Sequence, residues 1–217
     1  MHVMEKEVIF IPRLISFNES FVPVGQYTKS TKPLAVVWHE AIRGRKKEDL
    51  ISIFYAFLLR NRDVSNITIW LDNSAAQNKN WALFCFCIYA VNNCSELALK
   101  TLEIKYFQSG HTFMLADAFH HQVEKSLKRM GKVLDFDDFK RAVNDANSSK
   151  VDMSIKDFFD WKDFSSKYKI QRNNPKPYLQ DMSHLVFREG EYVMWKECRS
   201  LLPNMNAEEY PRRGKVT

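Results

Sequence analysis

The sequence predicts an α/β fold, in which a mixed five-stranded sheet is flanked by helices and followed by a small C-terminal α+β extension. Short apolar or β-branched segments alternate with segments in which apolar residues recur every three or four positions, as strands and amphipathic helices do. Of the 217 residues, 45% are hydrophobic and 13% aromatic, which is enough for a core. We therefore expect the chain to fold without a partner.

The expected elements follow one another in a defined order. A strand at residues 5–11 ends at Pro12, a weaker strand or short helix covers 17–27, and a clear strand covers 34–38. The periodicity then predicts a helix at 46–60, a strand at 67–71, a helix at 76–92, a strand at 99–107 and a helix at 117–130. This is the element order of the RNase H-like fold, in which right-handed crossovers place the later strands parallel to the first and beside it.

The remaining residues predict shorter elements. A helix begins at Asp135, and a capping-box pattern at 154–157 precedes an aromatic segment, 158–164, that we expect to pack against the main sheet. Residues 184–187 and 192–195 flank Arg-Glu-Gly-Glu and predict a hairpin. We expect residues 1–132 to form the core, 133–202 to pack on it as the extension, and 203–217 to be a flexible tail.

Charge, cysteines and hydropathy restrict the class of protein. The net charge of +6 is compatible with a polyanionic partner without requiring one. The four cysteines form no CxxC pair, and Cys85 and Cys87 lie in an apolar helix, so buried free thiols in a reducing compartment are expected. The apolar run at 81–91 is about half the ~20 residues that a membrane span needs. We expect a soluble nuclear or cytoplasmic protein with no membrane partner; its oligomeric state is not specified.

Two aspartates lie at the ends of expected elements, one directly after a strand and one at the start of a helix. Asp72 follows the strand at 67–71 and is succeeded by Asn73 and Ser74, whereas Asp117 lies at the head of the helix after the next strand. Two carboxylates at neighbouring element ends suit Mg²⁺ or Mn²⁺, which prefer hard oxygen ligands. Each also has an ordinary interpretation, Asp72 as a strand-ending cap and Asp117 as an acidic group favoured by the helix dipole.

At these residues the sequence resembles a known group. The segments VVWHEAIRGRKKEDL, LDNSAAQNKNWALF, IKYFQSGHTFMLADAFHHQVE and DFDDF resemble the uncharacterised domain found in many eukaryotic transposon-derived proteins, which is similar to the RNase H-like catalytic core of DDE-type transposases. The resemblance extends from about residue 8 to about residue 195. It implies a phosphoryl-transfer core in which three carboxylates hold two Mg²⁺ or Mn²⁺ ions, with Asp72 and Asp117 as two of the three.

The third carboxylate departs from the family pattern. The position of the first-strand aspartate is occupied here by Val3 or Met4, and the nearest carboxylates are Glu5 and Glu7, which share one face of the expected strand. We therefore expect a degenerate metal-dependent nuclease or strand-transferase core, with at most one bound metal and no strand cleavage. The alternative is a catalytically silent domain that binds protein or nucleic acid, so whether the chain is an enzyme stays open.

Three further side chains are candidates around the two aspartates. Glu124 lies two turns beyond Asp117 and is assigned either to the metal or to a pair with Lys128. His121 shares the helical face of Asp117 and is a candidate to orient or replace a ligand. The ordinary interpretation makes one of the two adjacent histidines half-buried against the sheet and the other solvated. His111 is expected near the Asp72 end of the sheet as a hydrogen-bond donor or a turn residue.

Basic residues suggest a contact with nucleic acid. Lys79 follows Gln77 and Asn78 at an expected helix start, where it would hold a phosphate, although Asn and Gln are also common caps. A second group is either a loop contacting the DNA backbone or a solvated helix entrance, and comprises Arg43, Arg45, Lys46 and Lys47. With residues 167–176 also basic, we expect weak, salt-dependent DNA binding without sequence preference. Because the first strand begins near residue 5, no amino-terminal DNA-binding domain is expected.

Overall fold

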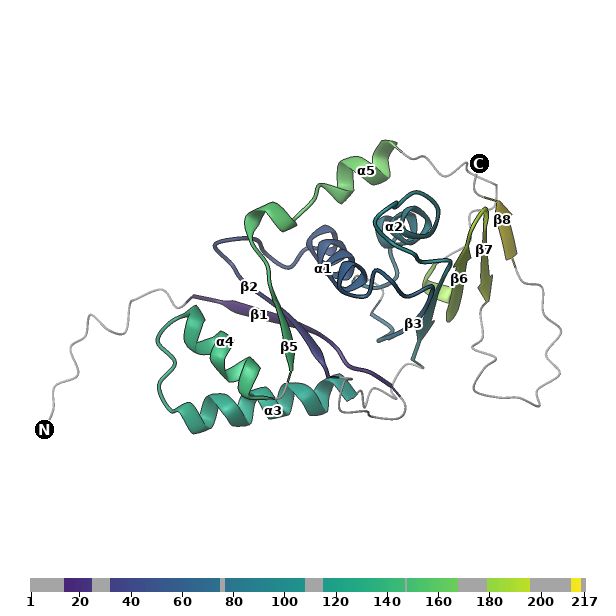
Figure 1. Ribbon diagram of the computed structural model, residues 1–217. Helices are drawn as coiled ribbons and strands as arrows, with labels where there is room; N and C mark the ends of the chain where they lie inside the picture. Colours follow the sequence, from purple (N-terminus) through teal and green to yellow (C-terminus); the bar gives the residue numbers. More distant parts are fainter. Residues whose placement is uncertain are drawn as a thin grey trace, which may run out of the picture. The chain divides into compact units, whose positions relative to one another are not determined.

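The computed structural model shows a mixed α/β protein, as the sequence predicted (Figure 1), and describes residues 14–24, 32–74, 77–107, 115–146, 148–167, 179–195 and 212–215. Its elements are β1 (Ser16–Phe21), β2 (Leu34–His39), α1 (Lys47–Arg60), β3 (Asn66–Leu71), α2 (Trp81–Asn92), β4 (Thr101–Tyr106), α3 (Leu115–Met130), α4 (Phe136–Asp145), β5 (Ser149–Asp152), η2 (Ile155–Asp157), α5 (Trp161–Lys167), η3 (Leu179–Asp181), β6 (His184–Arg188), β7 (Glu191–Trp195) and β8 (Arg212–Lys215). The strand expected at 5–11 lies outside the described residues.

The chain divides into two compact units, each built from segments distant in sequence. Unit 1 combines Met1–Gly44 with Leu115–Lys156, and unit 2 combines Arg45–Met114 with Asp157–Thr217. Neither of the domain boundaries expected from the sequence, at residues 132 and 202, coincides with a boundary between these units.

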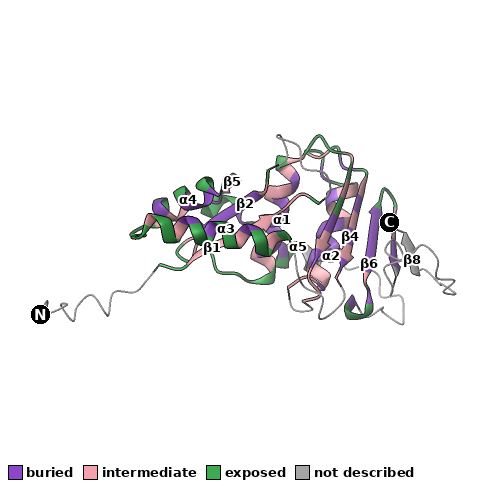
Figure 2. Ribbon diagram, turned by 90° about the horizontal axis from the view of Figure 1, so that it is seen from below, coloured by how far each residue is buried: buried purple, intermediate pink, exposed green. Residues whose placement is uncertain are grey.

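Unit 1 consists of a three-stranded sheet covered on one face by two helices. The strand order is β1-β2-β5, with β1 antiparallel and β5 parallel to β2. Helices α3 and α4 pack their apolar residues on the β2 face that carries Ala35 and Val37. The buried residues are Phe119 and Val123 on α3, Val143 on α4, and Ala146 directly after α4. The exposed residues of α3 and α4 lie on the opposite side of each helix (Figure 2).

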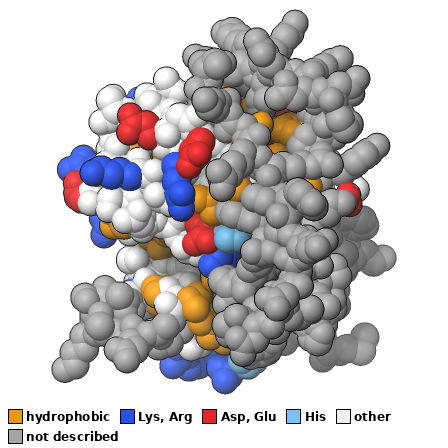
Figure 3. Space-filling view, turned by 90° about the vertical axis from the view of Figure 1, so that its right-hand side faces the viewer, with side chains coloured by type: hydrophobic (Ala, Val, Ile, Leu, Met, Phe, Trp, Pro, Cys, Tyr) orange, Lys and Arg blue, Asp and Glu red, His pale blue; other side chains and the backbone are white. Residues whose placement is uncertain are grey.

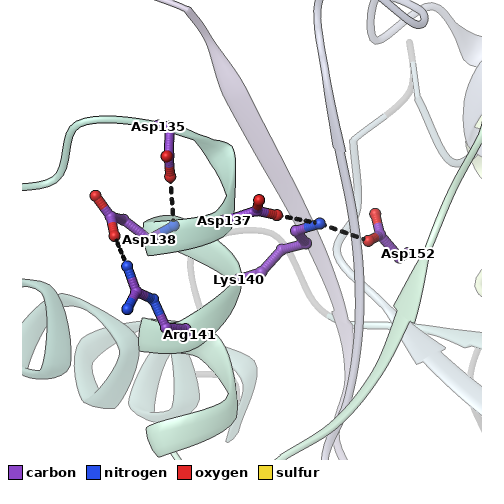
Figure 4. A network of polar contacts seen from close by, with 6 residues as sticks. All are labelled: Asp135, Asp137, Asp138, Lys140, Arg141 and Asp152. Atoms are coloured by element: carbon purple, nitrogen blue, oxygen red, sulfur yellow. Dashed lines mark hydrogen bonds and ion pairs between the residues drawn. The ribbon is translucent and has the colours of Figure 1, made fainter.

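Polar contacts fix α4 in unit 1. The Asp135 carboxylate accepts the Asp138 backbone N–H at 2.8 Å and caps the helix, as expected from the DFDDF segment. Lys140 lies between Asp137 at 2.6 Å and Asp152 at 3.0 Å, which ties α4 to β5 (Figure 4). Arg141 pairs with Asp138 one turn earlier on the same helix.

Unit 2 contains the second sheet and three helices. The strand order is β3-β4-β6-β7-β8, with β3 parallel to β4 and the remaining pairs antiparallel. Alternation along β4 buries Leu102, Ile104 and Tyr106, while the residues between them are half-buried. Helix α2, apolar over almost its whole length, contacts β4 and β6 and lies beside α1 and α5. The hairpin of β6 and β7 confirms the one expected around Gly190, and β6 is buried along most of its length (Figure 2).

The second sheet has five strands, but they are not the five that the sequence analysis expected to find in one sheet. The strands that the expected sheet was to unite fall into two sheets, because β5 completes the first and the β6–β7 hairpin pairs with the edge of β4 in the second. Residues of the expected C-terminal extension therefore complete both sheets instead of packing on a finished core. The sequence interpretation missed β5 because a four-residue strand gives little periodic signal.

The aromatic segment after residue 157 packs against helices, and not against the sheet as expected. The capping-box residues 154–157 contain only the short η2, and α5 begins later, where the Asp160 carboxylate accepts the Asp163 N–H at 3.0 Å. The Trp161 ring lies 4.9 Å from that of Phe86 on α2 and 5.9 Å from that of Tyr55 on α1, between centroids. A helix as apolar as α2 needs cover on more than one side, and α5 provides it.

Part of the expected flexible tail is ordered as a strand. Residues Arg212–Lys215 form β8 and pair antiparallel with β7. A hairpin at the end of a sheet leaves one row of backbone donors and acceptors open, and this segment satisfies them. The polar composition of the tail carried no signal of this pairing.

The predicted burial of the cysteines as free thiols is confirmed for the residues that the structure describes. Cys85, Cys87 and Cys94 are buried free thiols, and burial raises the pKa of the Cys87 thiol. Cys198 lies outside the described residues. In the described part of the chain, no helix has the length and apolarity needed to cross a bilayer.

Candidate functional site at the carboxyl end of strand β3

Asp72 lies directly after β3, at the carboxyl end of the parallel β3–β4 pair. The Phe107 N–H donates to the Leu71 carbonyl at 3.0 Å, which holds the two strand ends together. The Asp72 carboxylate accepts the Ser74 backbone N–H at 3.2 Å and a hydrogen bond from the Asn78 side-chain amide, both on Oδ1. The second oxygen, Oδ2, has no hydrogen-bond partner among the described residues. Asp72 is therefore oriented by its own loop and retains one oxygen for a ligand.

Residues 77–80, directly before α2, form a turn. The sequence had predicted instead that the helix would already begin at about residue 76. Helix α2 begins at Trp81, and its cap is Asn80, whose side chain accepts the Leu83 N–H at 3.0 Å. The Asn80 amide also donates to the Gln77 carbonyl at 2.8 Å, which closes the turn before the helix. Local side-chain hydrogen bonds thus shorten the helix by competing with its first turn. We call the described residues 72–74 and 77–80 the Asp72 loop.

Lys79 points into the protein, in contrast to the phosphate contact expected from the sequence. Only 8% of the residue is exposed. Its ammonium donates to the Gln180 carbonyl at 2.9 Å and lies 4.7 Å from the centre of the Tyr106 ring. Burial lowers the pKa of Lys79, and the nearby charge of Asp181 offsets this in part. These contacts assign the Lys79 charge to the interior of unit 2.

Asp117 belongs to unit 1, whereas Asp72 belongs to unit 2. Asp117 is exposed in the first turn of α3, where a carboxylate interacts favourably with the helix dipole. The structure therefore does not unite the two aspartates within one compact unit. His111, the donor expected beside Asp72, lies outside the described residues.

The side chains expected to assist Asp117 lie along α3. His121 and Glu124 form an exposed pair at 3.6 Å, so Glu124 contacts a histidine and not Lys128. The His120 ring nitrogen Nε2 lies 3.0 Å from the Ser20 hydroxyl on β1. One of the two adjacent histidines is thus half-buried against the sheet and the other solvated, which is the ordinary interpretation of this pair.

The described residues do not fit the two-metal centre that the family resemblance implies. No three histidine, cysteine, aspartate or glutamate side chains gather within the described ranges to hold a metal ion. Two-metal phosphoryl transfer needs a carboxylate between the ions, and Asp72 offers one unengaged oxygen. Glu5 and Glu7, the possible substitutes, lie outside the described residues. Within the described part of unit 2, Asp72 presents one carboxylate oxygen without a hydrogen-bond partner.

The basic group at the start of α1 is exposed, and consists of Arg43, Arg45, Lys46 and Lys47. Acidic residues follow at once: the Lys46 backbone N–H donates to the Asp49 carboxylate at 3.0 Å, and the Lys47 ammonium lies 3.8 Å from Glu48. On the face shown in Figure 3, basic side chains of the described residues likewise lie beside acidic ones. The group has the geometry of a solvated helix entrance, one of its two expected roles.

A pair between the buried His184 and the half-buried Glu103 in the second sheet was not expected from the sequence. Glu103 on β4 accepts from Thr68 at 2.8 Å and lies 2.5 Å from Nε2 of His184 on β6 and 3.3 Å from Lys105. Burial alone would raise the pKa of Glu103, but these partners together lower it. Burial lowers the pKa of His184 although Glu103 opposes the change. Alternation along β4 could have indicated that Glu103 and Lys105 share a face; nothing in the spacing pointed to His184.

Comparison with known proteins gives a family without an assigned activity. Neither a curated protein nor a solved structure matches the chain. A family model described as "Domain of unknown function (DUF7869)" matches residues 48–184, which is more than half of the 217 residues. The matched range includes Asp72, Lys79, Asp117 and the Glu103–His184 pair. The chain therefore belongs to the DUF7869 family.

Proposed function

We propose that the protein is a transposase-derived, RNase H-like domain with a degenerate metal-dependent nuclease or strand-transferase core. The observation that carries the proposal is the geometry of Asp72. Its carboxylate lies at the carboxyl end of a parallel strand pair, is oriented through Oδ1, and keeps Oδ2 for a ligand. The carboxyl ends of parallel strands are the usual location of ligand sites in α/β proteins.

The RNase H-like part of the proposal is supported by strand pairing. In that fold the later strands lie parallel to the first strand and beside it. Here β3 and β4 are parallel, and β3 stands at one end of its sheet, so one of its edges has no strand among the described residues. Glu5 and Glu7, which lie outside the described residues, are the carboxylates nearest in sequence to the position of the missing aspartate.

The degenerate character of the core follows from its ligands. Within unit 2 Asp72 supplies one free carboxylate oxygen, and no bridging carboxylate stands beside it among the described residues. When bound, Mg²⁺ or Mn²⁺ would supply electrostatic stabilisation of a phosphate. The alternative, a catalytically silent domain that binds protein or nucleic acid, is favoured by the two hydrogen bonds that already engage Oδ1 of Asp72.

Metal titration and a nicking assay test this proposal on the full chain. We expect calorimetry with Mn²⁺ to give at most one weakly bound ion, which Asp72→Asn abolishes and the exposed control Asp63→Asn does not. No nicking of supercoiled DNA is expected with either ion. Mn²⁺-dependent nicking that disappears in Asp72→Asn would overturn the degenerate assignment and point to Glu5 or Glu7 as the substitute ligand. Absence of any Mn²⁺ binding would favour the silent alternative.

A further inference from the structure

We propose that Lys79 is a positioning residue that fixes the Asp72 loop against β4 and η3, and thereby sets the orientation of the Asp72 carboxylate. The inference deepens the proposed function and rests on it in one respect, that Asp72 is the functional carboxylate. We do not assign Lys79 a direct contact with a ligand, because its ammonium faces the interior of unit 2.

A continuous chain of contacts leads from Lys79 to Asp72. The Lys79 ammonium lies over the Tyr106 ring, and the Tyr106 hydroxyl donates to the Asn78 carbonyl at 2.8 Å. The Asn78 side chain in turn donates to Oδ1 of Asp72. The Asn78 backbone N–H donates to the Ser74 carbonyl at 2.9 Å, which closes the loop on the other side. Each link is a direct contact between described residues of one unit.

The anchor joins segments that are far apart in the sequence. Lys79 and Gln180, whose carbonyl accepts the ammonium, are separated by 101 positions. Tyr106 is the last residue of β4 and only 4% exposed, so it offers the loop a fixed platform. A buried ammonium is stable only where it is hydrogen-bonded or lies against electron-rich groups, and the Gln180 carbonyl and the Tyr106 ring meet this need. The charge of Lys79 therefore holds the loop in one place.

A variant that removes the Lys79 charge can tell whether the residue positions the Asp72 loop or stabilises unit 2 as a whole. Methionine has nearly the length of lysine and is apolar, so Lys79→Met keeps most of the packing and removes the anchor. It also leaves the Gln180 carbonyl without this donor, so reference amides elsewhere in unit 2 are needed to tell a local effect from a loss of global stability. The matched control is Lys100→Met, at an exposed lysine of the same unit. The readout is amide hydrogen exchange, measured by NMR, at Ser74 and Asn78 and at reference amides within α2.

We expect exchange at Ser74 and Asn78 to become about ten-fold faster in Lys79→Met, with the α2 amides unchanged, because the loop opens without global unfolding. Lys100→Met should leave all of these rates as they are. Tyr106→Phe, which removes the hydroxyl bonded to Asn78, should act in the same direction. If both residues act through one network, the double variant should show less than the product of the two single effects.

Two results would overturn the inference: exchange at Ser74 and Asn78 unchanged in Lys79→Met, or exchange accelerated equally in α2, which would mark Lys79 as a general stabilising residue. A second readout is the broadening of loop resonances by Mn²⁺, which should weaken in Lys79→Met and not in Lys100→Met. If the unmodified protein shows no Mn²⁺ broadening while the exchange rates change as expected, the metal site in the proposed function fails and the positioning role stands.

Discussion

The hydroxyl of Ser52 joins α5 to α1, and its removal gives a quantitative test of the packing in unit 2. Ser52 is 1% exposed. Its oxygen accepts two hydrogen bonds, from the Trp161 indole N–H at 3.0 Å and from the Phe159 backbone N–H at 3.1 Å. The substitution Ser52→Ala leaves both donors without this acceptor and adds no bulk.

The expected cost follows from the surroundings of each donor. The Trp161 N–H lies in a buried contact, and a buried donor left unsatisfied costs about 1–3 kcal/mol. The Phe159 N–H is only partly buried and can be rehydrated, so its loss is that of an ordinary hydrogen bond, about 0.5–1.5 kcal/mol. The higher helix propensity of alanine offsets up to about 0.5 kcal/mol of this loss in the free energy of unfolding. We therefore expect the free energy of unfolding to fall by roughly 1–4 kcal/mol.

Urea denaturation followed by far-UV circular dichroism measures this change. The control Ser95→Ala, at an exposed serine of the same unit, should stay within about 0.5 kcal/mol of the unmodified protein. In a Trp161→Phe background the indole donor is gone, so Ser52→Ala should there cost only about 0.5–1.5 kcal/mol. A cost for Ser52→Ala that is negligible, or that is the same in both backgrounds, would refute the assignment of the hydroxyl as the link between α1 and α5.

Three further predictions concern pH, backbone conformation and DNA. Burial lowers the pKa of His184 below its ordinary value of 6.5, so as the pH falls through that value the unfolded chain takes up a proton that the folded chain does not. The free energy of unfolding should therefore fall below about pH 6.5, and His184→Gln, unlike His121→Gln, should reduce this loss in urea titrations at several pH values. Gly190 has φ +74°, so Gly190→Ala should cost about 1 kcal/mol or more in thermal unfolding. Gly44→Ala should cost less, because Gly44 has no positive φ, and an added Cβ would meet no neighbouring atom at either glycine. DNA affinity in gel shifts at two salt concentrations should fall steeply with salt and fall further when the basic residues of 43–47 are replaced by glutamine; affinity independent of salt would contradict an electrostatic contact.

Much of the secondary structure was determined by local sequence. The strands at 34–39 and 101–106, the helices at 47–60 and 136–145 and the hairpin around Gly190 were all expected, because apolar periodicity, caps and turn residues act over a few neighbouring positions. The start of α2 was misplaced by several residues. There Asn80 caps the helix, and its competition with Gln77 and Asn78 for the same role could not be resolved from composition.

The candidate site was predicted in part. The sequence placed Asp72 at the end of a strand, because an apolar segment followed by Asp-Asn-Ser stops a strand wherever it occurs. It gave no information on which oxygen of Asp72 is engaged, nor on the burial of Lys79. The engaged oxygen of Asp72 and the burial of Lys79 depend on contacts with Asn78 and with Tyr106. Tyr106 belongs to β4, which is distant from Asp72 in the sequence.

By itself the sequence indicated most of the helices and strands, although not β5 or β8, together with the position of Asp72 at a strand end and the burial of the thiols at 85, 87 and 94. The tertiary structure alone decided that the strands form two sheets, that aromatic residues near 161 cover α2, and that Lys79 turns inward. Each of these depends on pairings between residues many positions apart, such as Lys79 with Gln180 and Glu103 with His184. Periodicity reports the face that a segment will bury, whereas the partner that buries it is chosen by competition among all the apolar faces and open strand edges of the chain.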